Sequence, residues 1–534
     1  MNRITLRLSF FAAVALAMSF ARVYPQTASS GPWPGVSASS TLPLGVNLEG
    51  IADWMHSPMF VDAIKTSRPF GQPDQPWVDS GKMHVDANGW PLEDAGSVIM
   101  SQVPNMGGDY HLSCIGKAEV VPVASKAQVT NVHYDSQLNK TTADIIVAPS
   151  STQLMLSFTK TSGGVKDIRL IRPGYPADSK QLFTNEFIAA IKPFTVLRYM
   201  DYADTNGNPT VNWADRCEPT DAQYTLGKGG PWEDAIALAN QTGKEMWVNI
   251  PEEASDDYIR QMAALFKKEL LPGRIVYIEN SNEVWNWSFQ QATRNQQEAE
   301  KEAADPKSTL RVDTGVQWDD PNNKWYWGTK RVAERLVKIS EIWQTVYGKA
   351  ALNKTIRLVL ASQIVNPFLL KLQVGYIAKV VGPPRDYVYA VAGAPYFGLD
   401  DAMVKNTNAS VDDVLDNLSG AVDTNVNKVI PPVVAIAKQY GLNCFAYEGG
   451  PDVGQSTASL DAKIAANRSP KMTDLLVTYL KGWYADGGSL FMYFDLSSAY
   501  GQWGCWGLMD DVSKPSVKTE AITKILKLNL NAGQ

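Results

Sequence analysis

Residues 275–285 read IVYIENSNEVW, a run of four apolar residues that passes directly into a polar and acidic segment. A short apolar run of this kind is typical of a strand that is buried on both faces, as in a parallel sheet. The same change from apolar to polar recurs along the chain, at residues 194–200, 245–250, 356–360, 387–392, 443–447 and 489–494. These segments predict seven strands of one sheet.

Helical patterns separate these runs, at residues 232–242, 256–270, 330–346, 367–380, 411–440 and 471–485. Pro431 and Pro432 could interrupt the fifth of them. An eighth apolar run at 44–48 precedes a helical pattern at 59–65. Eight strand–helix units predict an α/β fold, the closed (β/α)8 TIM barrel. A doubly wound open sheet is the alternative, although no glycine-rich phosphate loop follows any of the strands.

A second sequence pattern lies between the first two predicted strands. Residues 107–172 alternate between apolar and polar positions and are rich in β-branched residues, with turn residues at 136–140 and 162–164. Strand-like runs occur at 118–123, 127–133, 142–147, 154–159 and 165–171. This pattern predicts an antiparallel β-sandwich-like domain inserted between strands 1 and 2. We expect the barrel to comprise 42–75 and 173–534, and the inserted domain 76–172.

The N-terminus has the pattern of an export signal. Arg3 and Arg7 precede an apolar run at 8–20, and the following residues are rich in Ser, Pro and Gly. The sequence predicts a signal peptide at 1–26 and a linker at 27–41, and therefore a secreted or periplasmic protein. No segment of the mature chain has the length and apolar character of a membrane span.

The bulk composition excludes some classes of function. A net charge of −6 and a pI near 5.5 give no electrostatic reason to expect a nucleic-acid partner. The four cysteines, at 114, 217, 444 and 505, form no metal-type cluster, and we expect neither a metal nor a cofactor. A Cys217–Cys505 disulfide and four buried free thiols are the two alternatives that we carry forward. Oligomeric state stays open.

Functional side chains of a barrel come from the carboxyl ends of its strands. Acidic and polar residues concentrate there, at 198–202, 249–253, 279–283, 362–363, 394–396, 447–450 and 495–497. We interpret Glu252 and Glu253 as charges at the N-terminus of the next helix. Glu283 and Glu448 follow the fourth and seventh strands, and these strands face each other across the mouth of an eight-stranded barrel.

Two facing carboxyls can cleave a glycosidic bond, because one protonates the leaving oxygen while the other attacks the anomeric carbon. In this interpretation Glu283 is the acid/base, and Glu448 is a nucleophile kept ionised by Arg198 and Tyr396. Glu279 alternates with Ser281 and Glu283 along one strand, so it takes a supporting role and is the less favoured alternative for the acid. Asp495 competes weakly with Glu448 for the role of nucleophile.

Asn282-Glu283 at the fourth strand end and Glu448 at the seventh resemble clan A of the glycoside hydrolases, the retaining (β/α)8 enzymes. The resemblance covers about 44–56 and 185–510, and it assigns no family within the clan. It implies that Asn282 contacts the sugar 2-hydroxyl and that Arg198 and Tyr396 hold the nucleophile. Glu279 is similar to the first Glu of the Trp-Glu-x-x-Asn-Glu pattern of the arabinofuranosidase, xylosidase and heparanase branches, although Ile278 stands where Trp is usual.

The sixteen tryptophans gain a role in this context, because flat aromatic faces stack well on pyranose rings. Several follow strands four and eight, namely Trp285, Trp287, Trp318, Trp325, Trp327, Trp503 and Trp506. We expect Trp285 and Trp503 to contact sugar, and others to pack helices onto the barrel. The inserted domain either binds carbohydrate or braces the barrel, and its few aromatic residues favour bracing.

The sequence therefore predicts a retaining glycoside hydrolase that cleaves β-glycosidic bonds of a polysaccharide or oligosaccharide by double displacement. A non-catalytic carbohydrate-binding protein on a barrel scaffold and a transglycosylase with the same residues are the alternatives. The sugar, the linkage and the choice between endo and exo action stay open.

Overall fold

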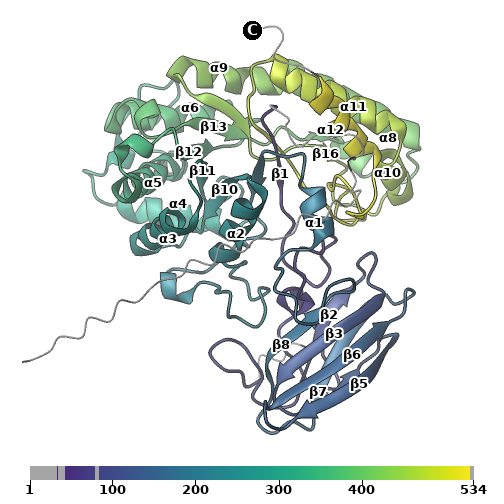
Figure 1. Cartoon of the computed structure of the whole chain (residues 1–534). Coiled ribbons are helices and arrows are strands. Elements are labelled where there is room, and N and C mark those ends of the chain that lie inside the picture. The colour runs from purple at the N-terminus through teal and green to yellow at the C-terminus, as the bar shows by residue number, and fades with distance from the viewer. Residues whose placement is uncertain (1–32, 34–41, 79–82, 529–534) are drawn as a thin grey trace, which may run out of the picture.

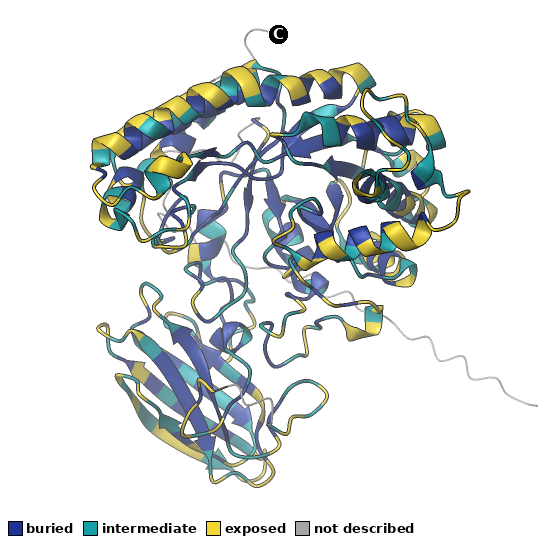
Figure 2. Ribbon diagram, turned by 180° about the vertical axis from the view of Figure 1, so that it is seen from behind, coloured by how far each residue is buried: buried dark blue, intermediate teal, exposed yellow. Residues whose placement is uncertain are grey.

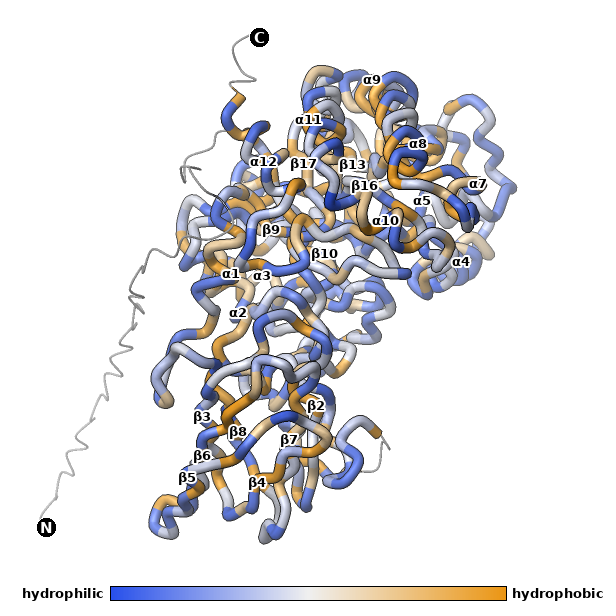
Figure 3. Tube along the Cα trace, turned by 90° about the vertical axis from the view of Figure 1, so that its right-hand side faces the viewer, coloured by the Kyte–Doolittle hydropathy of each residue, from blue (hydrophilic) through white to orange (hydrophobic). Residues whose placement is uncertain are grey.

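The structure is a computed structural model that describes residues 33, 42–78 and 83–528. The predicted signal peptide and nearly all of the predicted linker lie outside the described residues. Two bodies are visible, a helix-covered barrel and a smaller all-β body at one end of it (Figures 1 and 3). In the part of the chain that the structure describes, none of the helices is both long and apolar enough to cross a membrane.

Eight parallel strands of the described chain close into the barrel, in the order β1-β17-β15-β13-β12-β11-β10-β9. They are β1 (Leu44–Asn47), β9 (Val196–Arg198), β10 (Glu245–Ile250), β11 (Val276–Asn280), β12 (Ile356–Ala361), β13 (Ala390–Gly393), β15 (Asn443–Ala446) and β17 (Phe491–Tyr493). Each lies within or overlaps a predicted apolar run, so the predicted TIM barrel is confirmed. Nearly every strand residue is buried, which is why continuous apolar runs identified them (Figure 2).

The helices that cover the barrel are α1 (Asn185–Ala190), α2 (Trp232–Thr242), α3 (Asp256–Glu269), α4 (Gln290–Glu302), α5 (Lys324–Tyr347), α6 (Pro367–Tyr376), α8 (Val411–Thr424), α9 (Ile430–Tyr440), α11 (Pro470–Ala485) and α12 (Val517–Lys527). The short helices α7 (Asp401–Val404) and α10 (Leu460–Asn467) lie in loops. Pro431 and Pro432 do not break the chain's helical path. A π-helical turn, Asn425–Val429, joins α8 to α9, and the prolines occupy the first turn of α9, where a missing N–H costs little.

The helix predicted at 59–65 is mostly wrong. Only a 3₁₀ turn, Ala63–Thr66, forms there. Phe60 and Asp62 instead form β-bridges to Phe183 and Ile171, which keep this segment extended. The first α-helix after β1 is α1, which follows the inserted domain in the chain.

The inserted body is a sandwich of two antiparallel sheets, β2-β7-β4 and β5-β6-β3-β8. Its strands are β2 (Ala95–Ser101), β3 (Gly108–Ile115), β4 (Glu119–Pro122), β5 (Ala127–Asp135), β6 (Lys140–Val147), β7 (Gln153–Thr159) and β8 (Lys166–Ile171). The predicted insertion between the first two barrel strands is confirmed. Strand β2 lies before the β-rich stretch predicted at 107–172. Six of its seven residues are buried, so its sequence lacks the polar alternation of the other predicted strands.

Strand β2 also connects the sandwich to the barrel. The backbone N–H of Ser101 donates to the carbonyl of Asp53, in the loop after β1, at 2.9 Å. Val98 accepts from the N–H of Arg68 at the same distance, and Gly71 pairs with Gly96. The loop after β1 is therefore held partly by the inserted domain.

The four cysteines, all among the described residues, are buried free thiols. The Cys217–Cys505 alternative is therefore wrong. Cys217 packs within the main barrel core, whereas the backbone carbonyl of Cys505 accepts a hydrogen bond from the buried ammonium of Lys518. Burial raises the pKa of the Cys217 thiol, which keeps it unreactive.

Candidate active site

Arg198, the last residue of β9, is the centre of a buried polar cluster at the carboxyl end of the barrel. Its Nη1 donates to Oε1 of Glu448 at 2.7 Å and to Oδ1 of Asn47 at 2.9 Å. Its Nε and Nη2 donate to Oε2 of Glu279 at 3.2 and 2.9 Å. Burial alone lowers the pKa of Arg198, but Glu279 and Glu448 hold it above its usual value. The guanidinium is therefore a fixed positive charge between two carboxyls.

Glu448 follows β15 directly, and its two oxygens have separate donors. Oε1 faces Arg198, while the phenol of Tyr396, three residues after β13, donates to Oε2 at 3.0 Å. The residue is only 5% exposed. A carboxylate with one cation and one hydroxyl donor is oriented at both oxygens. The structure thus brings Arg198, Tyr396 and Glu448 together.

Glu283 lies in the loop after β11 and is half-buried. The phenol of Tyr447 donates to its Oε1 at 3.0 Å, and the amide of Asn286 donates to its Oε2 at 2.8 Å. Among the described residues Glu283 forms no ion pair, in contrast to Glu448. Tyr447, which holds Oε1 of Glu283, directly precedes Glu448 in the chain, and the charge of Glu283 raises the pKa of Glu448, so the two glutamates belong to one site.

Glu279 lies beneath this pair, at the end of β11. It is 1% exposed, and its Oε2 accepts from Arg198, from the indole of Trp247 at 2.8 Å and from the amide of Asn249 at 2.9 Å. Four donated hydrogen bonds fix this carboxyl against the guanidinium. The contacts suit a residue that positions Arg198, and they do not suit proton donation in an open cleft.

Asn282 is buried beside Arg198. Its Oδ1 accepts from Nη2 of Arg198 at 2.9 Å, and its Nδ2 donates to Oδ1 of Asn206 at 3.1 Å. The amide therefore links the loop after β9 to the loop after β11. This places Asn282 in the cluster next to Glu283.

Opposing effects act on the protonation of Glu448. Burial raises its pKa, Arg198 lowers it, and the charges of Glu283 and Asp201 raise it again, with a net value of about 8. The expectation that Arg198 and Tyr396 alone keep Glu448 ionised is therefore incomplete, because Arg198 is shared with Glu279. Burial also raises the pKa of Glu279. One guanidinium between two carboxyls leaves the cluster able to retain a proton near neutral pH.

Further acidic residues surround the cluster. Burial and the charge of Asp495 raise the pKa of Glu49 well above its usual value and that of Asp201 to about 7. Burial raises the pKa of Asp495 itself to about 6. Sequence reasoning gave no role to Asn47, Glu49, Asp201 or Tyr447. Asn47 could have been recognised as a single amide in an apolar strand. Tyr447 could not, because a tyrosine at a strand end resembles an ordinary core residue.

The tryptophans divide into exposed and packed groups. Trp503 is 68% exposed, and Trp285 is half-buried with an indole N–H that has no partner among the described residues. Trp287 and Trp325 are both more than half exposed and meet edge to face at 5.4 Å. Trp327, by contrast, donates to the carbonyl of Pro321 and lies beneath Arg311.

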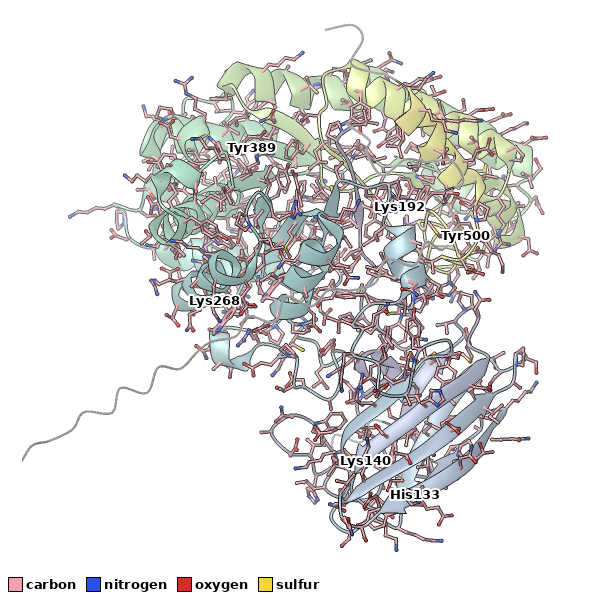
Figure 4. All side chains as sticks on the ribbon, in the orientation of Figure 1. His133, Lys140, Lys192, Lys268, Tyr389 and Tyr500 are labelled. Carbon is pink, nitrogen blue, oxygen red and sulfur yellow. The ribbon has the colours of Figure 1, made fainter. Side chains whose placement is uncertain are left out.

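Figure 4 places labelled residues of the two bodies in one view. Tyr389 lies within the barrel, whereas His133 and Lys140 lie on the sandwich, away from it. Glu252 and Glu253, expected as helix N-terminal charges, precede α3 and also form ion pairs: Glu252 with Arg294 and Arg331, and Glu253 with Arg294. These pairs join the loop after β10 to α4 and α5, outside the polar cluster around Arg198.

No protein-family model matches the sequence, and a comparison with curated proteins finds no match. Several solved structures are similar in chain trace. A 4-O-α-L-rhamnosyl-β-D-glucuronidase from Fusarium oxysporum 12S has a TM-score of 0.37 at 12% identity, over 62% of this chain and 60% of that chain. The CBM22–GH10 modules of an endo-1,4-β-D-xylanase from Clostridium thermocellum have a TM-score of 0.37 at 10% identity, over 88% and 97%.

A family 51 α-L-arabinofuranosidase from Bifidobacterium longum has a TM-score of 0.42 at 10% identity, over 67% of this chain and 69% of that chain. The match to the glucuronidase leaves about two fifths of that longer enzyme without a counterpart here. All three are glycoside hydrolases by these descriptions.

Proposed function

We propose that this protein is a retaining glycoside hydrolase that cleaves β-glycosidic bonds of a polysaccharide or oligosaccharide. The observation that carries the proposal is the unequal environment of its two glutamates. Glu448 has a buried cation and a phenol against its two oxygens, while Glu283 has only neutral donors. Environments that differ in this way assign different roles to two carboxyls of one site.

In the first step Glu448 attacks the anomeric carbon and forms a glycosyl ester. Glu283 gives its proton to the departing glycosidic oxygen, so the bond breaks without releasing an alkoxide. In the second step Glu283, now ionised, takes a proton from water, and the resulting hydroxide displaces Glu448 at the same carbon. Two inversions give net retention of the anomeric configuration.

The cluster must hold one proton in the reactive form, and that proton must reside on Glu283. Arg198 and Tyr396 stabilise the charged form of Glu448, against the burial and the neighbouring carboxylates that raise its pKa to about 8. Glu279 keeps Arg198 in place, and Asn282 reaches the sugar 2-hydroxyl from beside it. Trp285 and Trp503 contribute aromatic faces for pyranose rings. The reaction requires neither metal nor cofactor, and the predicted signal peptide places it outside the cytoplasm.

Product stereochemistry with an external nucleophile tests both roles. Glu448→Ala should lose hydrolysis of aryl β-glycosides and, with added azide, form the α-glycosyl azide, because azide then attacks directly. Glu283→Ala should retain turnover of activated aryl glycosides and form the β-glycosyl azide, because azide intercepts the glycosyl-enzyme. Proton NMR of the anomeric centre distinguishes the two. Full hydrolysis by both variants would falsify the assignment.

The alternatives differ in outcome. A carbohydrate-binding protein would bind glycans and release no reducing ends from any of them. A transglycosylase would give the same azide products but transfer sugar to glycan acceptors in preference to water. Mass spectrometry of products from a panel of polysaccharides separates these two from a hydrolase and identifies the sugar and linkage.

A further inference from the structure

A cavity of about 750 Å³ lies beside the catalytic cluster, between the barrel and the segment that leads into the sandwich. Its walls come from the loop after β1, the loop after β9, and residues 68–77. Asp201 lines it and lies close enough to Glu448 for its charge to act on that carboxyl. Glu49 and Asp201, which both line the cavity, follow Asn47 and Arg198 of the polar cluster by two and three residues, so the cavity lies next to that cluster.

One wall carries an aromatic platform. Trp54 is 60% exposed, and the guanidinium of Arg68 lies 5.7 Å from its ring centroid. Arg68 is fixed in turn by Asp53, with Nε 2.8 Å from Oδ1. An indole that is supported by a fixed cation and still largely exposed is prepared for stacking.

The sandwich positions this wall. Strand β2 binds the backbones of Asp53 and Arg68 through Ser101 and Val98. Trp77, which is 46% exposed, lies in the segment that the Gly71–Gly96 pair attaches to the same strand. Both exposed tryptophans of the cavity are thus attached to the edge of the inserted domain, whose place in the fold otherwise has no explanation.

The polar lining is mostly acidic. Asp53 is 2% exposed, and its Oδ2 has no hydrogen-bond partner within the described residues. Glu49, Asp201 and Asp204 also line the cavity, against one cation, Arg68, that is already paired. Carboxyl groups form hydrogen bonds with sugar hydroxyls, whereas a uronate carboxylate would find no unpaired cation among these lining residues.

We propose that this cavity binds further uncharged glycosyl units of the substrate, stacked on Trp54 and Trp77, and that the sandwich completes the cleft instead of binding glycan separately. This inference rests on the proposed hydrolase function and adds a substrate class to it. The chain acts on neutral oligosaccharides in preference to uronates. Because the cavity binds additional glycosyl units, kcat/KM is higher for substrates longer than one unit.

Kinetics on substrates of two lengths test the cavity. The probes are neutral hexasaccharides (β-1,4-gluco-, xylo- and mannohexaose, and β-1,3-glucohexaose) and the matching 4-nitrophenyl monoglycosides. For the sugar that is cleaved, Trp54→Ala and Trp77→Ala should each lower the ratio of hexasaccharide to monoglycoside kcat/KM by about tenfold. Trp54→Phe, which keeps a ring, should lower it less and serves if the alanine variant does not fold. Trp318→Ala removes a tryptophan that is 74% exposed outside the cavity and should leave the ratio unchanged.

Binding separates this inference from the proposed function. Calorimetry on Glu448→Gln protein should show that a neutral hexasaccharide binds, that Trp54→Ala weakens binding about tenfold, and that hexagalacturonate binds more weakly. Such binding without hydrolysis by the wild-type protein would sink the hydrolase and keep the site. Three outcomes would overturn the site. The first is hydrolysis in which Trp54→Ala and Trp77→Ala leave the ratio of hexasaccharide to monoglycoside kcat/KM unchanged. The others are tighter binding of the uronate and failure to bind any neutral hexasaccharide.

Discussion

The Nη1 atom of Arg198 lies 2.7 Å from Oε1 of Glu448, although 250 positions separate the two residues in the chain. The same guanidinium lies 2.9 Å from Glu279, so one cation serves two buried carboxyls. This sharing links the stability of the barrel mouth to the protonation of the proposed nucleophile.

Replacing Arg198 by Met should destabilise the protein by about 3–5 kcal/mol at pH 7, because two buried carboxyls lose their cation. Arg198→Lys keeps the charge but not the two-sided geometry, so its loss should be smaller. Urea unfolding measures both. The loss in the Met variant should shrink at pH 4, where the carboxyls can be protonated. Equal stability of the Met variant and the wild type at pH 7 would show that the ion pairs contribute nothing.

Replacing Glu448 by Gln should stabilise the protein at alkaline pH. Its pKa is raised to about 8 in the folded state, from an ordinary value of 4.5. The folded state therefore disfavours the charged form, and stability falls as pH rises from about 4.5 to about 8. The free energy of unfolding of Glu448→Gln should exceed that of the wild type most at pH 8.5, with a slope of at most about 1.4 kcal/mol per pH unit.

Glu341→Gln, on the exposed face of α5, is the matched control and should show no such pH-dependent difference. Thermal unfolding at pH 5, 7 and 9 is sufficient to compare the three proteins. A Glu448→Gln advantage that grew as the pH fell would reverse the sign and contradict the raised pKa.

Removing the two phenols should have different kinetic effects. Tyr396→Phe takes a donor from Glu448, and Tyr447→Phe takes one from Glu283. Each substitution should lower kcat/KM by roughly tenfold or more for an aryl glycoside with a poor leaving group. With Tyr447→Phe the loss should shrink as the leaving-group phenol becomes more acidic, because less proton donation is needed. With Tyr396→Phe it should be similar throughout an aryl glycoside series. Parallel leaving-group dependence in both variants would argue against separate roles.

Two glycine substitutions should act in opposite directions. A Cβ on Gly45, in β1, would lie 2.7 Å from the carbonyl oxygen of Val196 and 2.3 Å from Sδ of Met492. Gly45→Ala should therefore cost about 1–3 kcal/mol of stability by overpacking the barrel. Gly420, exposed in α8, has open space around it, so Gly420→Ala should add up to about 1 kcal/mol. Chemical unfolding of both variants checks the contrast, which would fail if Gly45→Ala were neutral.

Sequence alone determined the barrel, because each strand is short, apolar and buried on both faces, and this leaves a local signal that needs no partner. The insertion was equally visible for most of its length, since sandwich strands alternate. Strand β2 was missed because Gly96 and Ser97 interrupt its apolar run, so that it neither alternates nor reads as continuous. The helix expected at 59–65 is replaced by an extended segment and a 3₁₀ turn, because bridges to Phe183 and Ile171 hold this segment. Order along the chain also brought Glu283 and Glu448 to the same end of the barrel.

Only the tertiary structure decided what surrounds each acidic residue. Strand alternation predicts that Glu279, Ser281 and Glu283 share a face, but Ser281 and Glu283 have φ values of 56° and 43°, so the chain leaves the strand conformation there. Glu279, still in the strand, contacts Arg198, whereas Glu283 faces Tyr447 and Asn286. The sharing of one guanidinium, the acidic cavity and its support by the sandwich all depend on residues far apart in the chain. Such contacts leave no local pattern, because only the closed barrel and the docked insertion bring the residues within bonding distance.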